Sequence, residues 1–363
     1  MDASENQEAS AYVGVVLDSR WKIIEPLASG HFGIVYLAHD ADTNEPAVIK
    51  ILKVKHSGEP EHVQDFLDEA RFLTVLAKCD NVVEMFGSGR YPHVMTSTAG
   101  GFSAPVNAHY IAMEAADCSL TDLLVENTEV FTWPERLGIL RDVVQGVQQM
   151  HQRSIVNRDL KAENVLVFSA PHNELVAKVS DMGRAKSTRE ARRSTIERYA
   201  IPRGDWRFAA PEHIWCVGSD DPLLLRATDL YHTGSVLFEL VTGLGLTSVV
   251  LPTSAQIAAS TWQLQPDQRT AQYELVMPDL RNRFELVYEQ FAENVPRTIR
   301  TPLTALLRQL TDVDPMRRFR RVRGRPDCSD SLSWLINRID VIALQLRRAE
   351  IEAKRRERKK TMA

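Results

Sequence analysis

Residues 157–164 read Asn-Arg-Asp-Leu-Lys-Ala-Glu-Asn, and they stand directly before two short apolar runs, 165–168 and 175–179. A polar turn at 169–174 separates the two runs. Short apolar runs bounded by turn residues predict strands. We therefore expect a β-hairpin here, with the polar stretch at its open end.

This hairpin would place two oxygen ligands side by side. If the turn is centred between His172 and Asn173, Asn164 faces Asp181 on the opposite strand. Opposed side chains on paired strands stand about 5 Å apart. An amide oxygen and a carboxylate at that distance suit Mg²⁺, which takes few protein ligands and shares phosphate oxygens. A hairpin with polar ends is the ordinary alternative, and a register slip of one residue would separate the pair.

The rest of the chain divides into a strand-rich part and a helix-rich part. A helix is predicted at 62–77, and strands are predicted at 21–27, 34–39, 47–52, 82–86 and 110–114. The insertion before the last of these strands is expected to be a mobile loop. After Ala116 the pattern favours helices, and a capping box at Thr132 and Glu135 starts one of them. Strands followed by helices predict the α+β class.

Two charged residues of the strand-rich part lie in apolar settings. Lys50 lies in the apolar run 47–52, and Glu69 lies within the apolar stripe of the helix at 62–77. A buried charge is costly unless it is paired. We therefore expect Lys50 to pair with Glu69. The alternative is that Lys50 reaches solvent from a strand edge and Glu69 borders the stripe.

A turn containing Gly30 and Gly33 joins the first two strands. Glycines allow a backbone to approach phosphates and to present N–H groups to them. An ordinary hairpin is the alternative for such a turn taken alone. The strand-turn-strand setting excludes a dinucleotide-binding fingerprint, which requires a strand-to-helix turn.

Composition and charge limit the classes of protein to which the chain can belong. The 363 residues carry a net charge of −4, so no positive field indicates nucleic-acid binding. The four cysteines form no C-x-x-C pair and the N-terminus has no signal-peptide pattern, so we expect a reducing, cytoplasmic location. The apolar stretch 230–251 contains His232 and Glu239 and is expected to be a buried helix, not a membrane span.

Three stretches resemble signature elements of the protein-kinase family. Residues 157–164 resemble the catalytic loop H-R-D-L-K-x-x-N, 181–183 resemble D-F-G, and 210–212 resemble A-P-E. The glycine turn, Lys50 and Glu69 precede them in the family's order. This resemblance to the serine/threonine kinases covers about residues 21–319.

The resemblance implies a bilobal α+β fold with a β-rich N-lobe, one regulatory helix and an α-helical C-lobe. The implied segments are an N-terminal tail at 1–20, a kinase domain at 21–325 with lobes at 21–114 and 117–325, and a basic helical extension at 326–363.

The resemblance also implies roles in transferring the γ-phosphoryl group of ATP to a protein hydroxyl. Asp159 would orient the hydroxyl and accept its proton, and Lys161 would stabilise charge on the γ-phosphate. Asn164 and Asp181 would bind Mg²⁺. Lysine at position 161 is typical of serine/threonine specificity.

The implied ATP site combines the glycine turn, a lysine–glutamate pair for the phosphates and a hinge for adenine. Its residues are Leu27, Ala28, Ser29, Gly30, His31, Phe32, Gly33, Val35, Val48, Lys50, Glu69, Glu114, Ala116 and Leu166.

Two supporting contacts follow from the same resemblance. Asp229 would open the apolar helix at 230–241, cap its backbone and hold the catalytic loop. Residues 314–318 resemble the family's late D-P-x-x-R element, so Arg318 would pair with Glu212. These residues are expected to support the fold and not the chemistry.

The chain departs from the family pattern at several positions. Ala28 replaces the first glycine of the turn and disfavours positive φ. Asn157 replaces a histidine and Met182 a phenylalanine, and we expect a looser switch between active and inactive states. Asp205 replaces a threonine beside Asp159, and a second carboxylate should raise one pKa unless Lys161 bridges the two.

These departures keep an ATP-binding pseudokinase scaffold open as an alternative. A kinase of small molecules is a third possibility, although the Ala-Pro-Glu segment at 210–212 favours a protein acceptor. Against the scaffold, every residue to which the resemblance assigns a direct chemical task is present.

Two segments suggest regulation. Eight basic residues lie between Asp181 and Glu212, and we hypothesise that phosphorylated Ser194 or Thr195 docks on Arg158. The tail from Ser331 to Lys360 predicts a helix that docks on the second lobe, pairs with a partner helix, or contacts an anionic surface.

Overall fold

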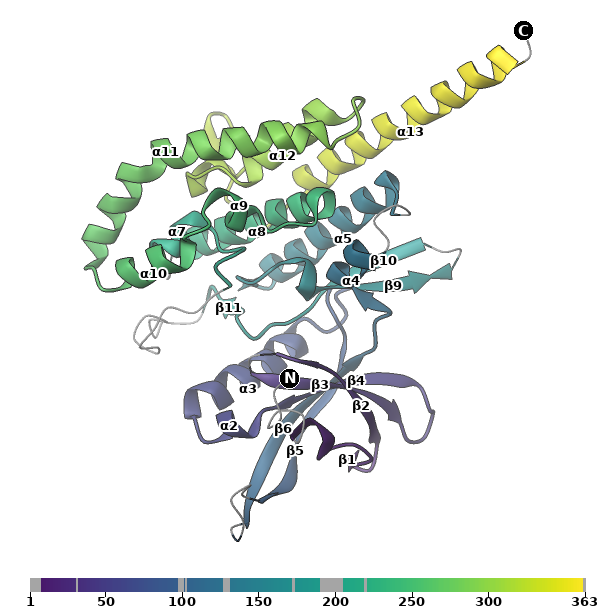
Figure 1. The fold of residues 1–363 in the computed structure, drawn as a ribbon, viewed down its shortest axis with the longest axis vertical. Helices are drawn as coiled ribbons and strands as arrows, with labels where there is room; N and C mark the ends of the chain where they lie inside the picture. Colours follow the sequence, from purple (N-terminus) through teal and green to yellow (C-terminus); the bar gives the residue numbers. More distant parts are fainter. Residues whose placement is uncertain are drawn as a thin grey trace. The chain divides into compact units, whose positions relative to one another are not determined.

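The structure is a computed structural model. It describes residues 8–30, 32–96, 101, 103–126, 131–171, 174–189, 205–218 and 221–361. The chain divides into two compact units (Figure 1). Within the described residues, the first comprises the chain up to Asp117 together with Asp181–Arg184, and we call it the strand unit. The second comprises Cys118–Ser180 and the chain from Ala185, and we call it the helical unit. The predicted α+β class is confirmed.

The strand unit contains a six-stranded sheet in the order β1-β2-β3-β4-β6-β5 (Figure 1). Every neighbouring pair is antiparallel. Its elements are β1 (Val16–Leu17), β2 (Trp21–Ser29), β3 (Gly33–Asp40), β4 (Pro46–Leu52), α2 (Val54–Ser57), α3 (Pro60–Val75), β5 (Met85–Thr96) and β6 (Ser103–Glu114).

Alternation along the central strands gives the sheet two different faces. Tyr36 and Ile49 point into a buried core, whereas Val35, Val48 and Lys50 lie on the opposite, partly exposed face. Successive side chains of a strand point to opposite faces, so the period of two in the sequence fixes this division. The partly exposed face is the one that carries the predicted nucleotide residues.

The predicted loose N-terminal tail is wrong for the residues that the structure describes. Ala9, Tyr12 and Leu17 belong to the core cluster of the sheet, and β1 pairs with β2. Burying these apolar side chains removes them from water, which offsets the entropy lost on ordering the segment.

The predicted mobile insertion is also largely wrong. Strands β5 and β6 continue as a long antiparallel hairpin whose ladder reaches Thr96 and Ser103. Pro92 and Pro105 obscured the strand signal, because proline cannot donate to a ladder and is normally confined to edges or bulges.

Helix α3 begins with Pro60 at its first turn, where the missing N–H costs no hydrogen bond. Phe66, Ala70 and Leu73 are buried at helical spacing, and Glu69 is buried beside them. The helix thus starts and ends two residues before the predicted bounds.

The helical unit consists of helices and short strand pairs (Figure 1). Its helices are α4 (Leu120–Glu126), α5 (Trp133–Gln152), α7 (Pro211–Ile214), α8 (Pro222–Thr242), α9 (Leu246–Val250), α10 (Ser254–Trp262), α11 (Pro266–Glu293), α12 (Arg300–Leu310), α13 (Ser333–Thr361) and the 3₁₀ turns η1 (Ala162–Asn164) and η3 (Pro315–Arg317). Its strands are β7 (Cys118–Ser119), β8 (Ile155–Val156), β9 (Val165–Ala170), β10 (Glu174–Val179), β11 (Lys186–Ser187), β12 (Arg321–Val322) and β13 (Arg325–Pro326).

The start of α5 confirms the predicted capping box. The Thr132 hydroxyl accepts from the Glu135 N–H at 3.5 Å, and the Glu135 carboxylate accepts from the Thr132 N–H at 2.7 Å. These contacts satisfy two N–H groups that a helix start would otherwise leave open.

We expect Thr132→Ala to lower the free energy of unfolding by about 1 kcal/mol, because the cap hydroxyl is lost while the helix remains. Thr132→Ser keeps the hydroxyl and is the matched control. Urea unfolding of the three proteins measures the effect, and an equal loss for serine and alanine would show that the cap hydroxyl is unimportant.

Helix α8 begins earlier than the sequence indicates. Asp221 caps it by accepting from the Leu223 N–H at 2.8 Å, and Gly243 ends it with φ of 70°. A left-handed residue after the last turn is well suited to glycine. Among the described residues, no helix has the length and apolarity needed to cross a membrane.

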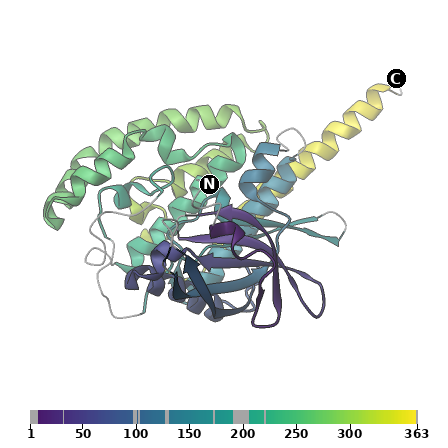
Figure 2. The ribbon, with the colours of Figure 1, turned by 60° about the horizontal axis from the view of Figure 1, so that its bottom comes forward.

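Helix α13 confirms the predicted C-terminal helix. Leu335, Ile339, Ile342 and Leu346 are buried. The helix packs on α5, where Asp340 pairs with Arg141 at 2.8 Å. Figure 2 shows the C-terminal part of α13 extending past α5. The first half of the helix is therefore docked, as one of the predicted alternatives requires.

Candidate active site

Lys50, Glu69 and Asp181 meet within the strand unit. The Lys50 Nζ atom lies 2.8 Å from both carboxylate oxygens of Glu69 and 3.2 Å from the Asp181 Oδ1 atom. Strand β4 supplies the lysine and α3 supplies the glutamate. The expected pairing of the two charges in apolar settings is therefore present, with a third charge beside it.

Burial and the neighbouring charges shift the pKa values of Lys50 and Glu69. Burial alone would lower the pKa of Lys50, but the Asp181 and Glu69 carboxylates outweigh burial and raise it. Lys50 therefore keeps its proton. Burial raises the pKa of Glu69 to about 7, against the opposing attraction of Lys50. The cluster is thus a lysine cation held between two acidic groups, an arrangement suited to phosphate oxygens.

The glycine turn between β2 and β3 closes with a hydrogen bond from the Gly30 N–H to the Gly33 carbonyl at 2.9 Å. Ala28 pairs with Val35 in the ladder and does not have positive φ. The strain that alanine would cause at positive φ is therefore absent. Leu27 and Ser29 lie at the end of β2, Phe32 lies in the turn, and His31 is outside the described residues.

Gly33 is required by a close approach of two strands. A Cβ atom at Gly33 would lie 2.9 Å from the Ile51 carbonyl oxygen and 3.3 Å from Lys50 Cγ. A Cβ atom at Gly30 would meet nothing nearer than the Gly33 oxygen at 3.7 Å. The two glycines thus differ in how far a methyl group disturbs the turn.

This difference predicts that Gly33→Ala costs about 1–3 kcal/mol of folding free energy, because overpacking forces β3 and β4 apart. Gly30→Ala is the matched control, and its stability should stay within about 0.5 kcal/mol of the parent. Thermal or urea unfolding measures both. Equal losses at the two positions would contradict the close approach at Gly33.

The predicted adenine residues lie in four strands, β3, β4, β6 and β9, and in the segment that follows β6. Val35 and Val48 lie on the same sheet face as Lys50, and Leu166 lies in β9 of the helical unit, paired with Ser119. Glu114 ends β6 and Ala116 follows it. The Glu114 carboxylate accepts from the Glu84 N–H at 2.7 Å, which holds the strand end in place.

The loop at 157–164 is ordered by its own polar groups. The Asn164 side-chain amide donates to the Asp159 carbonyl at 2.7 Å, and the Asp159 N–H donates to the Asn157 side-chain oxygen at 3.0 Å. Asn157 is fully buried. The asparagine that replaces the expected histidine therefore has a local hydrogen-bonding role, as its chemistry suggests.

Lys161 bridges to the unusual aspartate. Its Nζ atom lies 3.2 Å from Asp205 Oδ2 and 2.9 Å from Glu163 Oε2. Burial opposes ionisation of Asp205, but hydrogen bonding from Arg207 and the charge of Lys161 lower its pKa overall. Cations therefore keep Asp205 ionised. Burial alone would lower the pKa of Lys161, but the charge of Asp159 and the contact with Glu163 raise it, so Lys161 also interacts electrostatically with Asp159.

The predicted hairpin register is wrong by one residue. Strand β9 pairs with β10 so that Val165 faces Val179, and the Ser180 N–H donates to the Asn164 carbonyl at 2.9 Å. Asn164 therefore stands opposite Ser180, and Asp181 is the next residue along the chain. The polar turn does not determine where pairing begins, so the sequence alone could not set the register.

Asp229 supports the loop from α8. Its carboxylate accepts from the Asn157 N–H at 3.0 Å, from the Arg158 N–H at 2.9 Å, and pairs with His151 at 2.8 Å. The predicted holding role is confirmed, although Asp229 lies inside α8 and does not open it. Arg158 has φ of 70°, so this carboxylate holds a backbone conformation that a non-glycine residue rarely adopts.

Sequence reasoning missed Glu239. This buried carboxylate of α8 accepts from the Ala162 N–H at 3.2 Å, inside the same loop. Its only signal in the sequence is a charge in an apolar helix, which argues against a membrane span but names no partner.

Glu239 predicts a pH dependence of stability. Burial raises its pKa from 4.5 to about 8. Between these values the folded chain holds a proton that the unfolded chain has lost. The free energy of unfolding should therefore fall as pH rises through this range, by up to about 1.4 kcal/mol per pH unit. Glu239→Gln cannot lose a proton, so its slope in urea unfolding should be shallower. An unchanged slope would contradict the shift.

Three further predictions concern residues outside the loop at 157–164. Met182 is buried in the strand unit. Glu212 forms the expected ion pair with Arg318, at 2.6 and 2.7 Å. Ser194 and Thr195 lie outside the described residues.

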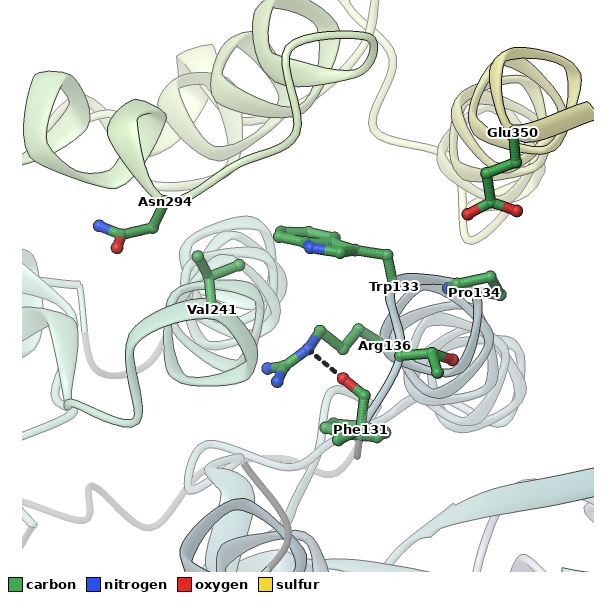
Figure 3. A pocket seen from close by; sticks show the side chains of 8 residues that line it. Phe131, Trp133, Pro134, Arg136, Val241, Asn294 and Glu350 are labelled. Carbon is green, nitrogen blue, oxygen red and sulfur yellow. Dashed lines mark hydrogen bonds between the residues drawn. The ribbon is translucent and has the colours of Figure 1, made fainter. Parts of the chain in front are cut away.

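A separate pocket of about 450 Å³ lies in the helical unit, where the start of α5 faces the ends of α8 and α11 and the side of α13 (Figure 3). Arg136 lies under Trp133 and donates to the Phe131 carbonyl at 3.1 Å (Figure 3). None of the residues assigned to phosphoryl transfer lines this pocket.

Comparison with known proteins identifies the family. The model of the protein kinase domain matches residues 21–322. The chain belongs to the protein kinase family. This match includes both the cluster around Lys50 and the loop around Asp159.

Bacterial serine/threonine kinases are among its relatives. A probable serine/threonine-protein kinase of Clostridium acetobutylicum is 28% identical over 64% of this chain and 31% of its own length. PrkC of Bacillus subtilis is 26% identical over 64% of this chain and 32% of its own length. PknL of Mycobacterium bovis is 26% identical over 63% of this chain and 50% of its own length. The aligned part of this chain thus spans about one third to one half of the length of these relatives.

The residues present fit Mg²⁺ and a nucleotide. The Asn164 side-chain N–H donates to a carbonyl, so its amide oxygen is the atom suited to a cation. Asp181 supplies a partly exposed carboxylate. Hard oxygen ligands of this kind are those that Mg²⁺ prefers. Gly30 has no side chain, and a Cβ atom there would meet nothing nearer than 3.7 Å, so the backbone of the turn is open to close approach at this residue.

Proposed function

We propose that this chain transfers the γ-phosphoryl group of ATP to a serine or threonine hydroxyl of a protein. The observation that carries the proposal is the loop at 157–164. Asn164 donates from its side chain to the Asp159 carbonyl and from its backbone N–H to the Lys161 carbonyl, and Asp229 holds the start of the loop. Family membership and the Lys50 cluster support it.

The residues divide the work in the following way. Asp159 accepts the proton of the attacking hydroxyl, and Lys161 offsets negative charge on the transferred group. Lys50 holds the phosphates, and Glu69 orients Lys50. Asn164 and Asp181 would hold Mg²⁺, which would offset the negative charge of the phosphates.

The proposal is tested with purified chain, Mg²⁺ and γ-labelled ATP, with the chain itself and generic proteins as acceptors. Hydroxyamino-acid analysis should show label on serine or threonine, and chelation of Mg²⁺ should abolish it. Nucleotide binding without transfer above an Asp159→Asn control would favour the pseudokinase scaffold. Label on a small molecule alone would favour the third possibility.

We also propose that the end of α13 contacts a negatively charged partner surface. Residues 347–360 hold eight basic and three acidic residues, and the side chains of 347–359 are exposed or partly exposed. Sedimentation with anionic vesicles should fall in high salt and on truncation after Leu346. Equal sedimentation of the truncated chain would overturn the proposal, and binding to an acidic helical protein alone would favour the partner-helix alternative.

A further inference from the structure

Three side chains with metal-binding chemistry meet where α2 ends and α3 begins. His56 lies in the last turn of α2, Glu59 is the residue directly before α3, and His62 lies in the first turn of α3. Their ligand atoms lie within 4.8 Å of one another. None of these residues belongs to the site described above.

The geometry directs both imidazoles toward one carboxylate. The Nδ1 atom of His62 lies 2.5 Å from Glu59 Oε2, and the Nδ1 atom of His56 lies 3.9 Å from Glu59 Oε1. The two rings are 4.5 Å apart at an interplanar angle of 80°. Each imidazole thus directs its Nδ1 atom at a different oxygen of the same carboxylate.

Burial distinguishes this cluster from a surface group of charges. His56 and His62 are each 7% exposed, whereas the Glu59 side chain is 56% exposed. The two nitrogen ligands are therefore positioned by packing, and the carboxylate closes the group from the solvent side.

The ligand set indicates which ion fits. Imidazole nitrogen suits zinc, copper and nickel, whereas Mg²⁺ and Ca²⁺ prefer oxygen ligands. Tetrahedral Zn²⁺ with bonds of about 2.0–2.2 Å holds its ligand atoms roughly 3.4 Å apart. The present separations bracket that value, so small side-chain rotations suffice. We propose that His56, Glu59 and His62 bind a divalent transition metal ion, with Zn²⁺ as the best fit and a fourth position open to water.

A metal ion here would join α2 to the first turn of α3. Helix α3 carries Glu69, and the Phe32 ring of the glycine turn lies 5.9 Å from His56 and 5.3 Å from His62. The ion would therefore restrain the helix start and the side chains against which the glycine turn packs.

Binding is measured by calorimetric titration of the metal-stripped full chain with Zn²⁺, in excess Mg²⁺ so that the Asn164 and Asp181 oxygens are not available to zinc. One equivalent should bind, and Co²⁺ should give the absorption spectrum of a tetrahedral ion. His56→Asn, His62→Asn and Glu59→Gln should each weaken Zn²⁺ binding by about 100-fold or more, since loss of outer-shell partners alone costs 10–100-fold.

His39→Asn is the matched control. His39 is a partly exposed histidine of the same unit, 3.3 Å from Asn44, and lies outside the cluster. The His39→Asn variant should bind Zn²⁺ with the same affinity as the parent. Because Glu59 is exposed, Glu59→Gln tests the site even if the buried histidine variants unfold, which circular dichroism would reveal. Equal affinity of the parent and Glu59→Gln, or an octahedral Co²⁺ spectrum, would overturn the proposal.

Discussion

Asp159→Asn is expected to reduce the turnover number for phosphoryl transfer by about 10²- to 10⁴-fold, the contribution usual for a positioned general base. Asparagine has the same shape but cannot accept the proton of the attacking hydroxyl. The two shorter hydrogen bonds of residue 159 use its backbone N–H and carbonyl, so they survive the change. A longer one, from the Asn164 amide to Asp159 Oδ2 at 3.4 Å, involves the side chain that is replaced. Steady-state kinetics with varied ATP measure the effect, and KM for ATP should change little.

Lys50→Met provides the contrast for this prediction. Lys50 contacts Glu69 and Asp181 and would hold phosphates, so its loss should raise KM for ATP by roughly 10- to 100-fold, the worth of a charge-assisted hydrogen bond. The two variants should therefore affect different kinetic constants. A turnover number within about twofold of the parent for Asp159→Asn would exclude Asp159 as the proton acceptor.

The second large effect concerns stability. We expect Arg318→Leu to lower the free energy of unfolding by about 3–5 kcal/mol, because it leaves the Glu212 carboxylate buried without its cation. The pair is bidentate at 2.6 and 2.7 Å and fully enclosed. Arg318 also donates to the Asp312 carbonyl at 2.8 Å and to the Ala227 carbonyl at 3.0 Å. One side chain thus holds η3, α7 and α8 together.

A double-mutant cycle separates the orphaned charge from the lost packing. Arg318→Leu with Glu212→Leu removes both charges, so its loss should be smaller than the sum of the two single losses. Arg317→Leu is the neighbouring control. Arg317 is exposed and pairs with Asp314 at 3.4 Å, so its loss should stay below about 1 kcal/mol. If urea unfolding shows that Arg318→Leu also loses less than about 1 kcal/mol, the prediction is refuted.

Much of the site follows from local sequence. A charge within an apolar run needs a partner, and this rule alone predicts the pairing of Lys50 with Glu69. Asp229 follows from the resemblance of the chain to the kinases, and its carboxylate is stable inside an apolar helix because it accepts hydrogen bonds from the loop. Such predictions succeed because the cost of an unpaired buried charge exceeds most competing terms.

Other features of the site could not be predicted from the local sequence. The register that sets Asn164 opposite Ser180 depends on where β9 and β10 begin to pair, and a shift of one residue costs little at a polar turn. Glu239 was visible only as a charge, since its partner is a backbone N–H at Ala162, and every residue except proline has such a group.

The loop at 157–164 shows what the sequence alone could provide and what required the tertiary structure. By itself, the sequence predicts which side chains would carry the chemistry, through the resemblance of this loop to the catalytic loop of the kinases. Only the tertiary structure decided which backbone groups of the loop Asp229 contacts, and that Glu239 of α8, about seventy residues further along the chain, also holds the loop. In the strand unit, only the tertiary structure decided that Ala9 and Tyr12 join the core. Hydrogen bonds and apolar burial between distant segments depend on which surfaces meet, and a local pattern does not record that.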